Sequence, residues 1–600
     1  MNNAQKRASA NDSVARRWLR AIEATAPIAQ NPYRILHHDI EELAAKRGNA
    51  PALLSDRECL SYAEVAERSN RYARWALGEA LAKGETVCLL MLNRPEYLAI
   101  WLGITRIGGV VALLNTNLTG PSLANSIDIV APSHVIVASE LVDSLATALP
   151  ELKSKPTIWI HGDSGKSYRR IDLEIRQRSG EKLHESELRP VSVGDRALYI
   201  YTSGTTGLPK AANVSHARIL QWSHWFSGMM NACPSDRIYD CLPMYHSVGG
   251  IVAPGAMLVS GGSVVTREKF SASTFWGDVR RWDCTLIQYI GELCRYLLQT
   301  PSCPGDSAHR VRMACGNGLA ADVWDKFRTR FQIPKIFEFY ASTEGGVSLF
   351  NIEGECGAIG RVPSYLAHRF SPALVRFDFE KEAPWRNELG FCVRCAADEV
   401  GEALGHLRDD PDNIGNRFEG YTTAADSEKK ILRSVFKPGD AWVRTGDLMR
   451  KDARGFYYFV DRVGDTFRWK GENVATSEVS QVICSFPEVR EATVYGVPVP
   501  GSDGRAGMAT LVTSGSLDLL RFRRHLIGQL PGYARPLFLR MRNDMEITGT
   551  FKHTRANLVR QGYDPRATDD LLYFDHPEYQ AFVPVDQELY QRIQAGHIRL

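Results

Sequence analysis

The residues best suited to chemistry form a polar loop directly after an apolar run. Residues 197–201 (Ala-Leu-Tyr-Ile-Tyr) are typical of a strand, and residues 202–210 (Thr-Ser-Gly-Thr-Thr-Gly-Leu-Pro-Lys) follow it. Glycine lets the backbone approach an anion closely, and backbone N–H groups, hydroxyls and an ammonium together bind phosphate oxygens. The loop therefore predicts a nucleoside triphosphate site. Its predicted ligands are Thr202, Ser203, Gly204, Thr205, Thr206, Gly207 and Lys210.

The loop is not a Walker A motif, which requires Gly-x4-Gly-Lys-Ser/Thr. Pro209 has no N–H to offer a phosphate, and Ala211 stands where that motif has a hydroxyl residue. The stretch 162–167 (Gly-Asp-Ser-Gly-Lys-Ser) fails by spacing, because Ile160 occupies the position of the first Walker glycine. We interpret it as a polar turn, and a P-loop ATPase or kinase fits the sequence poorly.

A second chemical group follows the strand-like residues 335–339. It reads Tyr340-Ala-Ser-Thr-Glu344, which puts an aromatic ring, hydroxyls and a carboxylate at the carboxyl end of a strand. Ligand crevices of parallel sheets lie at such ends, and Mg²⁺ prefers hard oxygen ligands such as carboxylates and phosphates. The alternative interpretation is a capped helix start at Ser342 and Thr343.

The elements that must position these groups alternate along the chain. Apolar strand-like runs are separated by longer helix-like stretches, which predicts an α/β fold with largely parallel strands. At 600 residues, two or more domains are expected. We predict a large multi-subdomain α/β domain over residues 1–461, a hinge at 462–464 and a small mobile α+β domain over 465–600. The predicted strands are 87–92, 135–138, 157–160, 197–201, 285–290 and 335–339.

Composition narrows the function classes. The chain is 44% hydrophobic and 24% charged with a net charge of +3, so we expect no nucleic-acid partner, since such proteins show a strong basic excess. Twelve cysteines without a framework suit a reducing cytosol. Cys392 and Cys395 lack a second ligand pair at suitable spacing, which favours two reduced thiols over a zinc site.

We expect neither a signal peptide nor a membrane-spanning helix. The first residues are polar, and the apolar stretch 99–114 contains Arg106 and two glycines, which favours a buried helix leading into a strand. Residues 13–25 predict a basic amphipathic helix in which Val14, Trp18 and Ile22 share a face. Such a helix can lie on the inner face of an anionic membrane. The alternative is packing on its own domain.

The loop at 203–210 resembles the phosphate loop of the adenylate-forming superfamily, which includes acyl-CoA synthetases, luciferases and peptide-synthetase adenylation domains. Residues 340–344 match its Tyr-x-Ser-Thr-Glu motif. The resemblance implies that Tyr340 contacts adenine, Thr343 lies near the α-phosphate and Glu344 holds Mg²⁺. It also implies that Gly316, Asn317 and Gly318 contact adenine, although a bare Gly-x-Gly could equally be a simple turn.

Further matches extend toward the C-terminus. Arg444-Thr-Gly-Asp447 resembles the ribose motif, with Asp447 as the carboxylate that accepts from the ribose hydroxyls, and Arg462 matches the arginine that reaches the nucleotide. In residues 546–552 (Glu-Ile-Thr-Gly-Thr-Phe-Lys), Lys552 aligns with the adenylation lysine, and Phe551 replaces the usual glycine. Such a lysine would neutralise charge that builds at the α-phosphate.

One branch fits best, the fatty acid transport proteins, also called very-long-chain acyl-CoA synthetases. Residues 465–474 (Asp-Thr-Phe-Arg-Trp-Lys-Gly-Glu-Asn-Val), 494–497, 504–508 and 547–552 carry the resemblance, and Gly464 and Phe551 are normal for this branch. Eukaryotic members usually begin with a membrane-spanning segment, which this sequence does not show. The resemblance implies a bacterial-type, cytoplasmic protein, in contact with the membrane only peripherally, with oligomeric state open.

The resemblance implies an ATP-dependent long-chain or very-long-chain fatty acid-CoA ligase that acts through an acyl adenylate, with ATP, Mg²⁺ and coenzyme A. His246 would orient the acyl group or gate its tunnel, or be a hydrogen-bonded core histidine. Gly249 and Gly250 would leave room for the chain, Tyr289 and Gly291 would lie along the same wall, and Lys470 and Gly471 would line the pantetheine path.

Three alternatives stay open: a CoA ligase for bile-acid, branched or aryl carboxylates, a fatty acyl-AMP ligase that loads a carrier protein, and a fatty-acid uptake protein in which ligation traps the import.

Overall fold

The computed structural model describes residues 13–202, 209–370, 372–379, 381–407, 415, 417–470, 472–500, 504–545 and 555–598. The chain divides into two units of dense internal contact. The first contains Met1–Leu319, Phe327–Glu355 and His406–Ile431, and the second contains Ala320–Lys326, Cys356–Gly405 and Leu432–Leu600. The second unit contains sheets that precede residue 462 in the sequence and sheets that follow it. It does not divide at residues 462–464, and the hinge predicted there stays a prediction.

The first unit contains a seven-stranded sheet that ends in a hairpin. Its strands are parallel except for the last pair, β8 and β9, which is antiparallel. The strands predicted at 87–92, 135–138, 157–160 and 197–201 are confirmed. In spatial order they are β7 (Arg169–Arg170), β6 (Thr157–His161), β5 (His134–Ala138), β3 (Thr86–Leu90), β4 (Val110–Leu113), β8 (Arg196–Thr202) and β9 (Lys210–Ser215).

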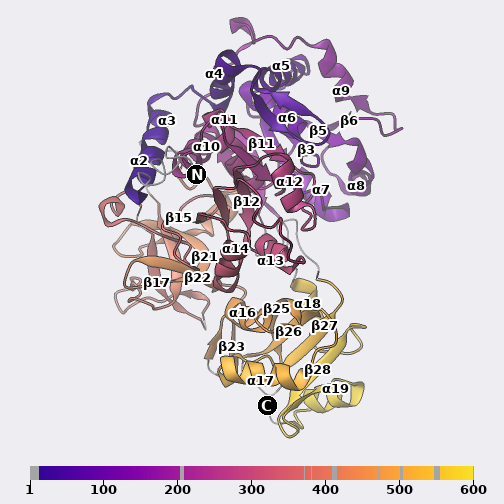
Figure 1. Cartoon of the computed structure of the whole chain (residues 1–600), viewed down its shortest axis with the longest axis vertical. Coiled ribbons are helices and arrows are strands. Elements are labelled where there is room, and N and C mark those ends of the chain that lie inside the picture. The colour runs from indigo at the N-terminus through magenta and orange to yellow at the C-terminus, as the bar shows by residue number, and fades with distance from the viewer. Residues whose placement is uncertain are drawn as a thin grey trace. The chain divides into compact units, whose positions relative to one another are not determined.

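Helices cover this sheet (Figure 1). Helix α5 (Tyr62–Gly78) begins with a capping box, in which Ser61 and Glu64 bond reciprocally to each other's backbone N–H. Every residue of helix α6 (Pro95–Arg106) is buried, and strand β4 follows it, as predicted for residues 99–114. Helices α7 (Gly120–Asp128), α8 (Val142–Ala148) and α9 (Ile171–Glu174) lie in the chain between strands β4 and β8 of this sheet.

The second sheet of this unit has eight strands, and it confirms the strands predicted at 285–290 and 335–339. Six central strands are parallel and the two edge strands are antiparallel. In spatial order they are β15 (Ser348–Asn351), β14 (Ile336–Ala341), β13 (Met313–Asn317), β12 (Leu286–Ile290), β10 (Arg237–Asp240), β11 (Ser263–Thr266), β1 (Pro51–Leu54) and β2 (Cys59–Ser61). Its helices are α4 (Leu36–Arg47), α10 (His216–Met230), α11 (Ala253–Ser260), α12 (Phe275–Arg281), α13 (Gly291–Gln299) and α14 (Ala321–Arg330).

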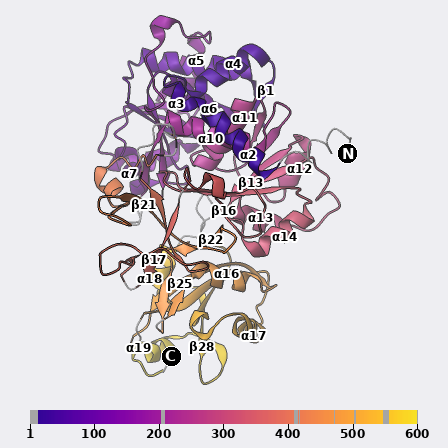
Figure 2. The same ribbon diagram turned by 90° about the vertical axis from the view of Figure 1, so that its left-hand side faces the viewer.

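The N-terminal helix α2 (Val14–Thr25) packs on its own unit beside α10 (Figure 2). The Trp18 ring is 2% exposed and lies edge-on to Trp225 and Phe350, with ring centroids 5.7 Å apart in each pair. The helix face that carries Trp18 therefore packs on its own domain, which is the alternative that the sequence left open. Helix α3 (Pro27–Gln30) follows. Within the described ranges, no helix combines the length and the apolar character needed to span a bilayer.

The second unit contains a largely antiparallel seven-stranded sheet. In spatial order it has β16 (Gly360–Arg361), β22 (Phe456–Arg462), β21 (Ala441–Lys451), β19 (Gly401–His406), β17 (Ala373–Asp378) and β18 (Ala383–Pro384), with β20 (Ile431–Arg433) also paired to β21. Strand β22 ends at Arg462, where the predicted hinge begins.

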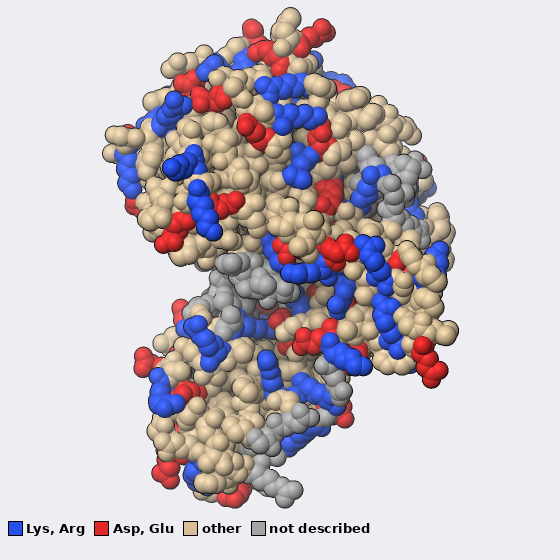
Figure 3. All heavy atoms as spheres, turned by 180° about the vertical axis from the view of Figure 1, so that it is seen from behind, with Lys and Arg blue, Asp and Glu red and all other residues tan. Residues whose placement is uncertain are grey.

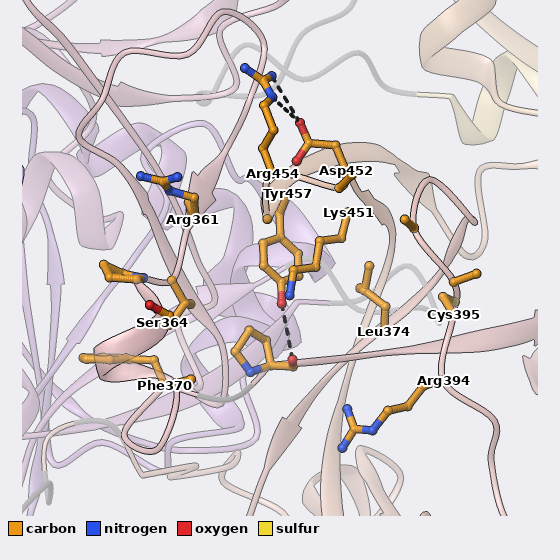
Figure 4. Close-up of a pocket in the computed structure, with 18 of the residues that line it drawn as sticks. Arg361, Ser364, Phe370, Leu374, Arg394, Cys395, Lys451, Asp452, Arg454 and Tyr457 are labelled. Carbon is orange, nitrogen blue, oxygen red and sulfur yellow. Dashed lines mark hydrogen bonds and ion pairs between the residues drawn. The ribbon is translucent and has the colours of Figure 1, made fainter.

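A cavity of about 900 Å³ opens at one end of this sheet (Figure 4). Four cationic side chains line it, and each lies over an aromatic ring, as Arg394 does over Phe436 at 4.0 Å and Lys451 over Tyr457 at 5.1 Å. Arg454 also pairs with Asp452 at 3.1 Å. None of the residues predicted to bind substrate lines this cavity.

The C-terminal part of the second unit forms a mixed five-stranded sheet with helices, the predicted α+β arrangement. The strands in order are β25 (Val489–Pro498), β26 (Arg505–Thr513), β27 (Phe538–Arg542), β28 (Leu571–His576) and β29 (Ala581–Pro584). The helices are α16 (Thr476–Cys484), α17 (Leu519–Gln529), α18 (Ala556–Gln561) and α19 (Gln587–Gln594), and strands β23 (Phe467–Trp469) and β24 (Glu472–Val474) form a separate ribbon.

A buried carboxylate joins the end of β22 to this C-terminal part. The Asp461 Oδ2 atom accepts from the Thr476 N–H at 2.5 Å and from the Thr476 hydroxyl at 2.9 Å, at the start of α16. Burial raises the pKa of Asp461. On the molecular surface, charges of both signs are interspersed over the face seen in Figure 3, in keeping with the net charge of +3.

Candidate functional site

Four of the predicted segments follow four adjacent parallel strands. Residues 242–250 follow β10, Gly291 follows β12, Gly318 follows β13, and residues 342–344 follow β14. These strands run parallel to one another, so their carboxyl ends lie along one edge of the eight-stranded sheet. Open α/β sheets bind ligands at that edge. The topology thus collects residues that are about 100 positions apart in sequence.

The predicted phosphate loop closes the β8–β9 hairpin. Thr202 ends β8, Lys210 begins β9, and the two residues are cross-strand partners. The predicted ligands Ser203, Gly204, Thr205, Thr206 and Gly207 lie outside the described residues. The hairpin register therefore fixes both ends of the loop.

Lys210 lies beside a segment that the sequence analysis did not select, residues 417–430. Its Nζ atom pairs with Asp426 Oδ1 at 2.9 Å and lies 5.7 Å from the centroid of the Tyr421 ring. The Thr423 hydroxyl and Lys210 both lower the pKa of Asp426. Helix α15 (Ala424–Glu428), capped by Thr423, carries this aspartate.

Backbone bonds hold residues 417–430 against strand β9. The N–H of Asn213 donates to the Gly420 carbonyl at 3.0 Å, the Thr422 N–H donates to the Ala211 carbonyl at 3.1 Å, and Ala212 pairs with Tyr421 as an antiparallel bridge. The Ser215 hydroxyl also donates to Glu419 at 2.6 Å. The segment therefore extends the hairpin sheet by a short additional strand.

The same segment surrounds Glu344. The Tyr421 hydroxyl donates to Glu344 Oε1 at 2.8 Å, and Lys430 Nζ lies 3.6 Å from that oxygen. Glu344 is 8% exposed, and the Glu419 N–H donates to its carbonyl at 3.0 Å. Burial, then Glu344, raises the pKa of Tyr421, while a hydrogen bond with Thr202 opposes that shift. Thr202, Lys210, Glu344 and Tyr421 are thus brought together.

Thr343 is fixed through its backbone. Its carbonyl accepts from the guanidinium of Arg218, a buried residue of α10, at 2.7 Å. The Ser342 hydroxyl donates to the Gly345 carbonyl at 2.7 Å. Residues 342–345 are thus a hydrogen-bonded turn, and the alternative of a helix start at Ser342 is wrong.

The donor set at Glu344 fits a magnesium ion bound together with phosphate. A buried carboxylate is a hard oxygen ligand, and Mg²⁺ in nucleotide sites is usually held by one or two carboxylates plus the substrate's phosphates. Across the described ranges, no group of three or more His, Cys, Asp or Glu side chains could hold a metal ion. With Glu344 as one carboxylate ligand, phosphate oxygens of the nucleotide would supply further ligands to such an ion.

The predicted adenine segment, residues 316–318, is held by a buried acid that was not predicted from the sequence. Glu338, two residues before Tyr340 on β14, accepts from the Tyr289 hydroxyl at 2.5 Å, from the Gly318 N–H, and from the Leu319 N–H at 3.2 Å. Burial raises the pKa of Glu338 to about 8, and these hydrogen bonds oppose the shift. Glu338 stands between Phe337 and Phe339 in a strand with apolar residues on both faces. That position could have indicated a buried carboxyl group.

Glycines bring the segments predicted to line the acyl wall and to contact adenine into close backbone contact. A Cβ at Gly291 would lie 1.7 Å from the Gly318 carbonyl oxygen, and one at Gly316 would lie 2.3 Å from the Tyr289 carbonyl oxygen. The Tyr289 side chain is fully buried. Gly291 and Tyr289 therefore contribute to packing between strands, and their place along an acyl wall stays a prediction.

His246 lies in a loop that Asn93 holds. The Asn93 amide donates to the Leu242 carbonyl at 2.7 Å, and its oxygen accepts from the Met244 N–H at 2.8 Å. The His246 ring is half-buried against Tyr245, at 4.6 Å between centroids. A π-helix over Val248–Val252 follows, and such turns occur often at functional sites.

The interpretation of Gly249 and Gly250 as room for an acyl chain is wrong. A Cβ at Gly250 would lie 2.0 Å from the Met244 carbonyl oxygen, and one at Gly249 would lie 2.7 Å from that of Leu242. The space beside these glycines is filled by the loop's own backbone.

In the second unit, Asp447 and Arg462 are brought together. They are cross-strand partners on β21 and β22, with Arg462 Nε 3.8 Å from Asp447 Oδ1. Arg444 forms a bidentate pair with the fully buried Glu402, at 3.0 and 2.7 Å, and Gly446 donates to the same carboxylate at 3.2 Å. The Arg-Thr-Gly-Asp motif is thereby anchored at its first residue.

The remaining predicted residues concern coenzyme A and the catalytic lysine. Lys470 is exposed at the turn between β23 and β24, with Nζ 5.9 Å from the Trp469 ring centroid. Gly471 and Lys552 lie outside the described residues. Their predicted roles stay predictions.

The fold and the carboxyl-edge site define an AMP-binding enzyme. The family model for AMP-binding enzymes matches residues 40–366, more than half of the chain. Among solved structures, an anthranilate CoA ligase in complex with anthranoyl-AMP has a TM-score of 0.73 at 21% identity, covering 87% of this chain and 96% of that one. A fatty acyl CoA synthetase of Mycobacterium tuberculosis has a TM-score of 0.60 at 20% identity, covering 88% and 98%. At these identities the likeness shows the fold alone.

Sequence relatives are more specific. Long-chain fatty acid transport protein 6 of Mus musculus is 40% identical over 91% of this chain and 88% of its own length. The very long-chain fatty acid transport protein of Cochliobolus heterostrophus is 36% identical over 94% and 88%. The chain belongs to the fatty acid transport protein family, as the motifs at 465–474 and 547–552 predict.

The raised pKa of Glu338 predicts a component of the pH dependence of stability. Its stabilising contribution is fully present below the ordinary glutamate pKa near 4.5 and is lost as pH rises through about 8. Glu338→Gln removes this component. We expect the thermal unfolding midpoint of the wild type to fall more between pH 5.5 and 8.5 than that of the variant. Equal shifts in both proteins would contradict a protonated, buried Glu338.

Proposed function

We propose that this protein is an ATP-dependent ligase that joins long-chain or very-long-chain fatty acids to coenzyme A through an acyl adenylate. One observation carries the proposal: Lys210, Thr202, Tyr421 and Glu344 meet at the carboxyl edge of the parallel sheet. A cation from a phosphate-type loop next to a buried carboxylate is the pairing that a metal-bound triphosphate requires. Membership of the fatty acid transport protein family supports the choice of acid.

A carboxylate is inert toward thiols at neutral pH, so the proposed reaction has two steps. The fatty acid oxygen attacks the α-phosphorus of ATP, the bond to the bridging oxygen breaks, and pyrophosphate leaves. The thiol of coenzyme A then attacks the acyl carbon and AMP leaves. Positioning and electrostatic stabilisation dominate such phosphoryl chemistry.

We assign the roles as follows. Lys210 and the loop of residues 203–207 counter the charge of the β- and γ-phosphates, and Thr343 lies near the α-phosphate. Glu344 would hold Mg²⁺, which when bound offsets charge on the phosphate oxygens. Tyr340 and residues 316–318 contact adenine, Asp447 contacts the ribose, and Arg462 reaches the nucleotide. Lys552 is the adenylation lysine, and His246 orients the acyl group.

Two domain positions serve the two steps. Lys552 must leave and the coenzyme A face with Lys470 and Gly471 must enter, so we propose rotation of residues 465–600 about 462–464. Gating by a hinge of a few residues is a common device in such enzymes. The hydrogen bonds from residue 476 to Asp461 cross this proposed hinge and would break on rotation.

The substrate class has a direct test in ATP–pyrophosphate exchange across fatty acids of increasing length. Each buried methylene contributes about 0.8 kcal/mol, so we expect the apparent KM of the acid to fall about fourfold per methylene until the site is filled. Product analysis with coenzyme A present distinguishes a thioester from a released or carrier-bound acyl adenylate. A preference for aryl or bile acids would favour that alternative, and absence of AMP with every acid would overturn the proposal.

The role of Lys552 predicts a split between the half-reactions. We expect Lys552→Ala to lower adenylate formation by about 10²–10³-fold, the range found when one group that stabilises developing charge is removed. Thioester formation from supplied acyl-AMP should be largely retained. Lys381→Ala, at an 80%-exposed lysine, is the control. Equal loss of both half-reactions would contradict the assignment.

We further propose a cytoplasmic location, which the free cysteines support, with peripheral membrane contact through the outward face of α2. Trp18 is buried, so the contact would use Arg16 and Leu19, which is 53% exposed. We expect Arg16→Glu to reduce co-sedimentation with anionic vesicles, because a cation near the surface contributes about 1 kcal/mol. Lys381→Glu is the matched charge reversal, and equal binding of both variants would remove α2 from the contact.

A further inference from the structure

Two lysines lie near helix α15 at the proposed triphosphate site. Lys210 comes from the phosphate-loop hairpin, and Lys430 comes from the end of residues 417–430. Lys430 side-chain exposure is 27%, and that of Glu344, its partner at 3.6 Å, is 11%. A lysine this close to a metal-type carboxylate lies within reach of any phosphate bound to that metal.

The partners of the two lysines differ in kind. Lys210 pairs with Asp426, a residue of the same segment, whereas Lys430 pairs with the carboxylate that we assign to the metal ion. A divalent cation at Glu344 repels the Lys430 ammonium, since like charges at this range interact strongly in a partly buried site. A phosphate oxygen of the nucleotide would then offer this ammonium an anionic partner.

We propose that Lys430 is a second phosphate-binding cation, which contacts the β- or γ-phosphate of ATP, and that Tyr421 is a positioning residue for Glu344. This inference rests on the proposed function, because it takes Glu344 as the metal ligand. It extends the nucleotide site to Tyr421 and Lys430, which lie outside the motifs in the sequence.

Three hydrogen bonds of Tyr421 fix its position, which suits a positioning role. Its hydroxyl donates to Glu344, its N–H donates to the Ser427 hydroxyl at 2.9 Å, and its carbonyl accepts from the Asn213 amide at 3.0 Å. Its ring lies under Lys210. One residue thus sets the carboxylate rotamer and the approach of the lysine, as outer partners of metal ligands commonly do.

The test of Lys430 compares ligands that differ in their phosphates. We expect Lys430→Gln to weaken binding of a non-hydrolysable ATP analogue by about tenfold or more, the usual effect of losing a charged hydrogen bond, and to leave AMP binding unchanged. Calorimetry measures both without turnover. Thioester formation from supplied acyl-AMP should also be unchanged, because acyl-AMP has no β- or γ-phosphate.

Neighbouring residues supply matched controls. Lys429→Gln removes the same charge from an adjacent lysine that is 70% exposed, and it should bind the analogue as the wild type does. Lys430→Arg keeps the cation and should bind more tightly than Lys430→Gln. If Lys430→Gln binds the analogue as tightly as the wild type or more tightly, Lys430 is only a counter-ion for Glu344, and the inference is overturned.

Tyr421→Phe tests the positioning role through the metal. We expect Mn²⁺, followed by water-proton relaxation in the presence of the ATP analogue, to bind about 10- to 100-fold more weakly, with the AMP affinity retained. Unchanged Mn²⁺ affinity would contradict the role. A wild type that neither binds the analogue nor exchanges pyrophosphate would count against the proposed function itself, whereas an active wild type with insensitive variants would count only against this inference.

Discussion

The hydrogen bond from Tyr421 to Glu344 is the contact on which the proposed site depends. It joins the carboxyl edge of the eight-stranded sheet to a segment that is itself bonded to the hairpin of the seven-stranded sheet. A buried carboxylate without a fixed donor would be costly and free to rotate. The phenol removes both problems, because it supplies a donor at 2.8 Å while its ring packs beneath Lys210.

A second buried acid lies at the same edge, beside the residues that are predicted to contact adenine. Glu338 accepts hydrogen bonds from one hydroxyl of β12 and from two backbone N–H groups of the turn after β13. Its partners are neutral dipoles, whereas Glu344 has Lys430 nearby. Hydrogen bonds from these neutral dipoles oppose the effect of burial without cancelling it, so the pKa of Glu338 is raised. One carboxyl group thus serves as a structural acceptor, and the other is available to a cation.

Local pattern predicted much of this structure. Apolar runs bounded by turns located the strands, and charge and hydroxyl groups at the ends of two of them located Lys210 and Glu344. Sequence could not reveal Tyr421, Asp426 and Lys430, because residues 417–430 have no strand periodicity and acquire their role from pairing with β9. It also misassigned Gly249 and Gly250, since a glycine near a candidate active-site histidine looks the same in sequence whether ligand or backbone fills the adjoining space.

If two half-reactions share one nucleotide site, the contacts across the proposed hinge must be able to break and form again. Asp461 precedes the proposed hinge and is buried, and within the described part of the chain its carboxylate accepts hydrogen bonds from the first residues of α16 and from the N–H of Arg462. Rotation about 462–464 would return this carboxylate to water and its pKa toward the ordinary value. The lost hydrogen bonds would be offset by relief of desolvation. A contact balanced in this way can hold one orientation without preventing the other, which is what alternation between adenylate formation and thioester formation requires.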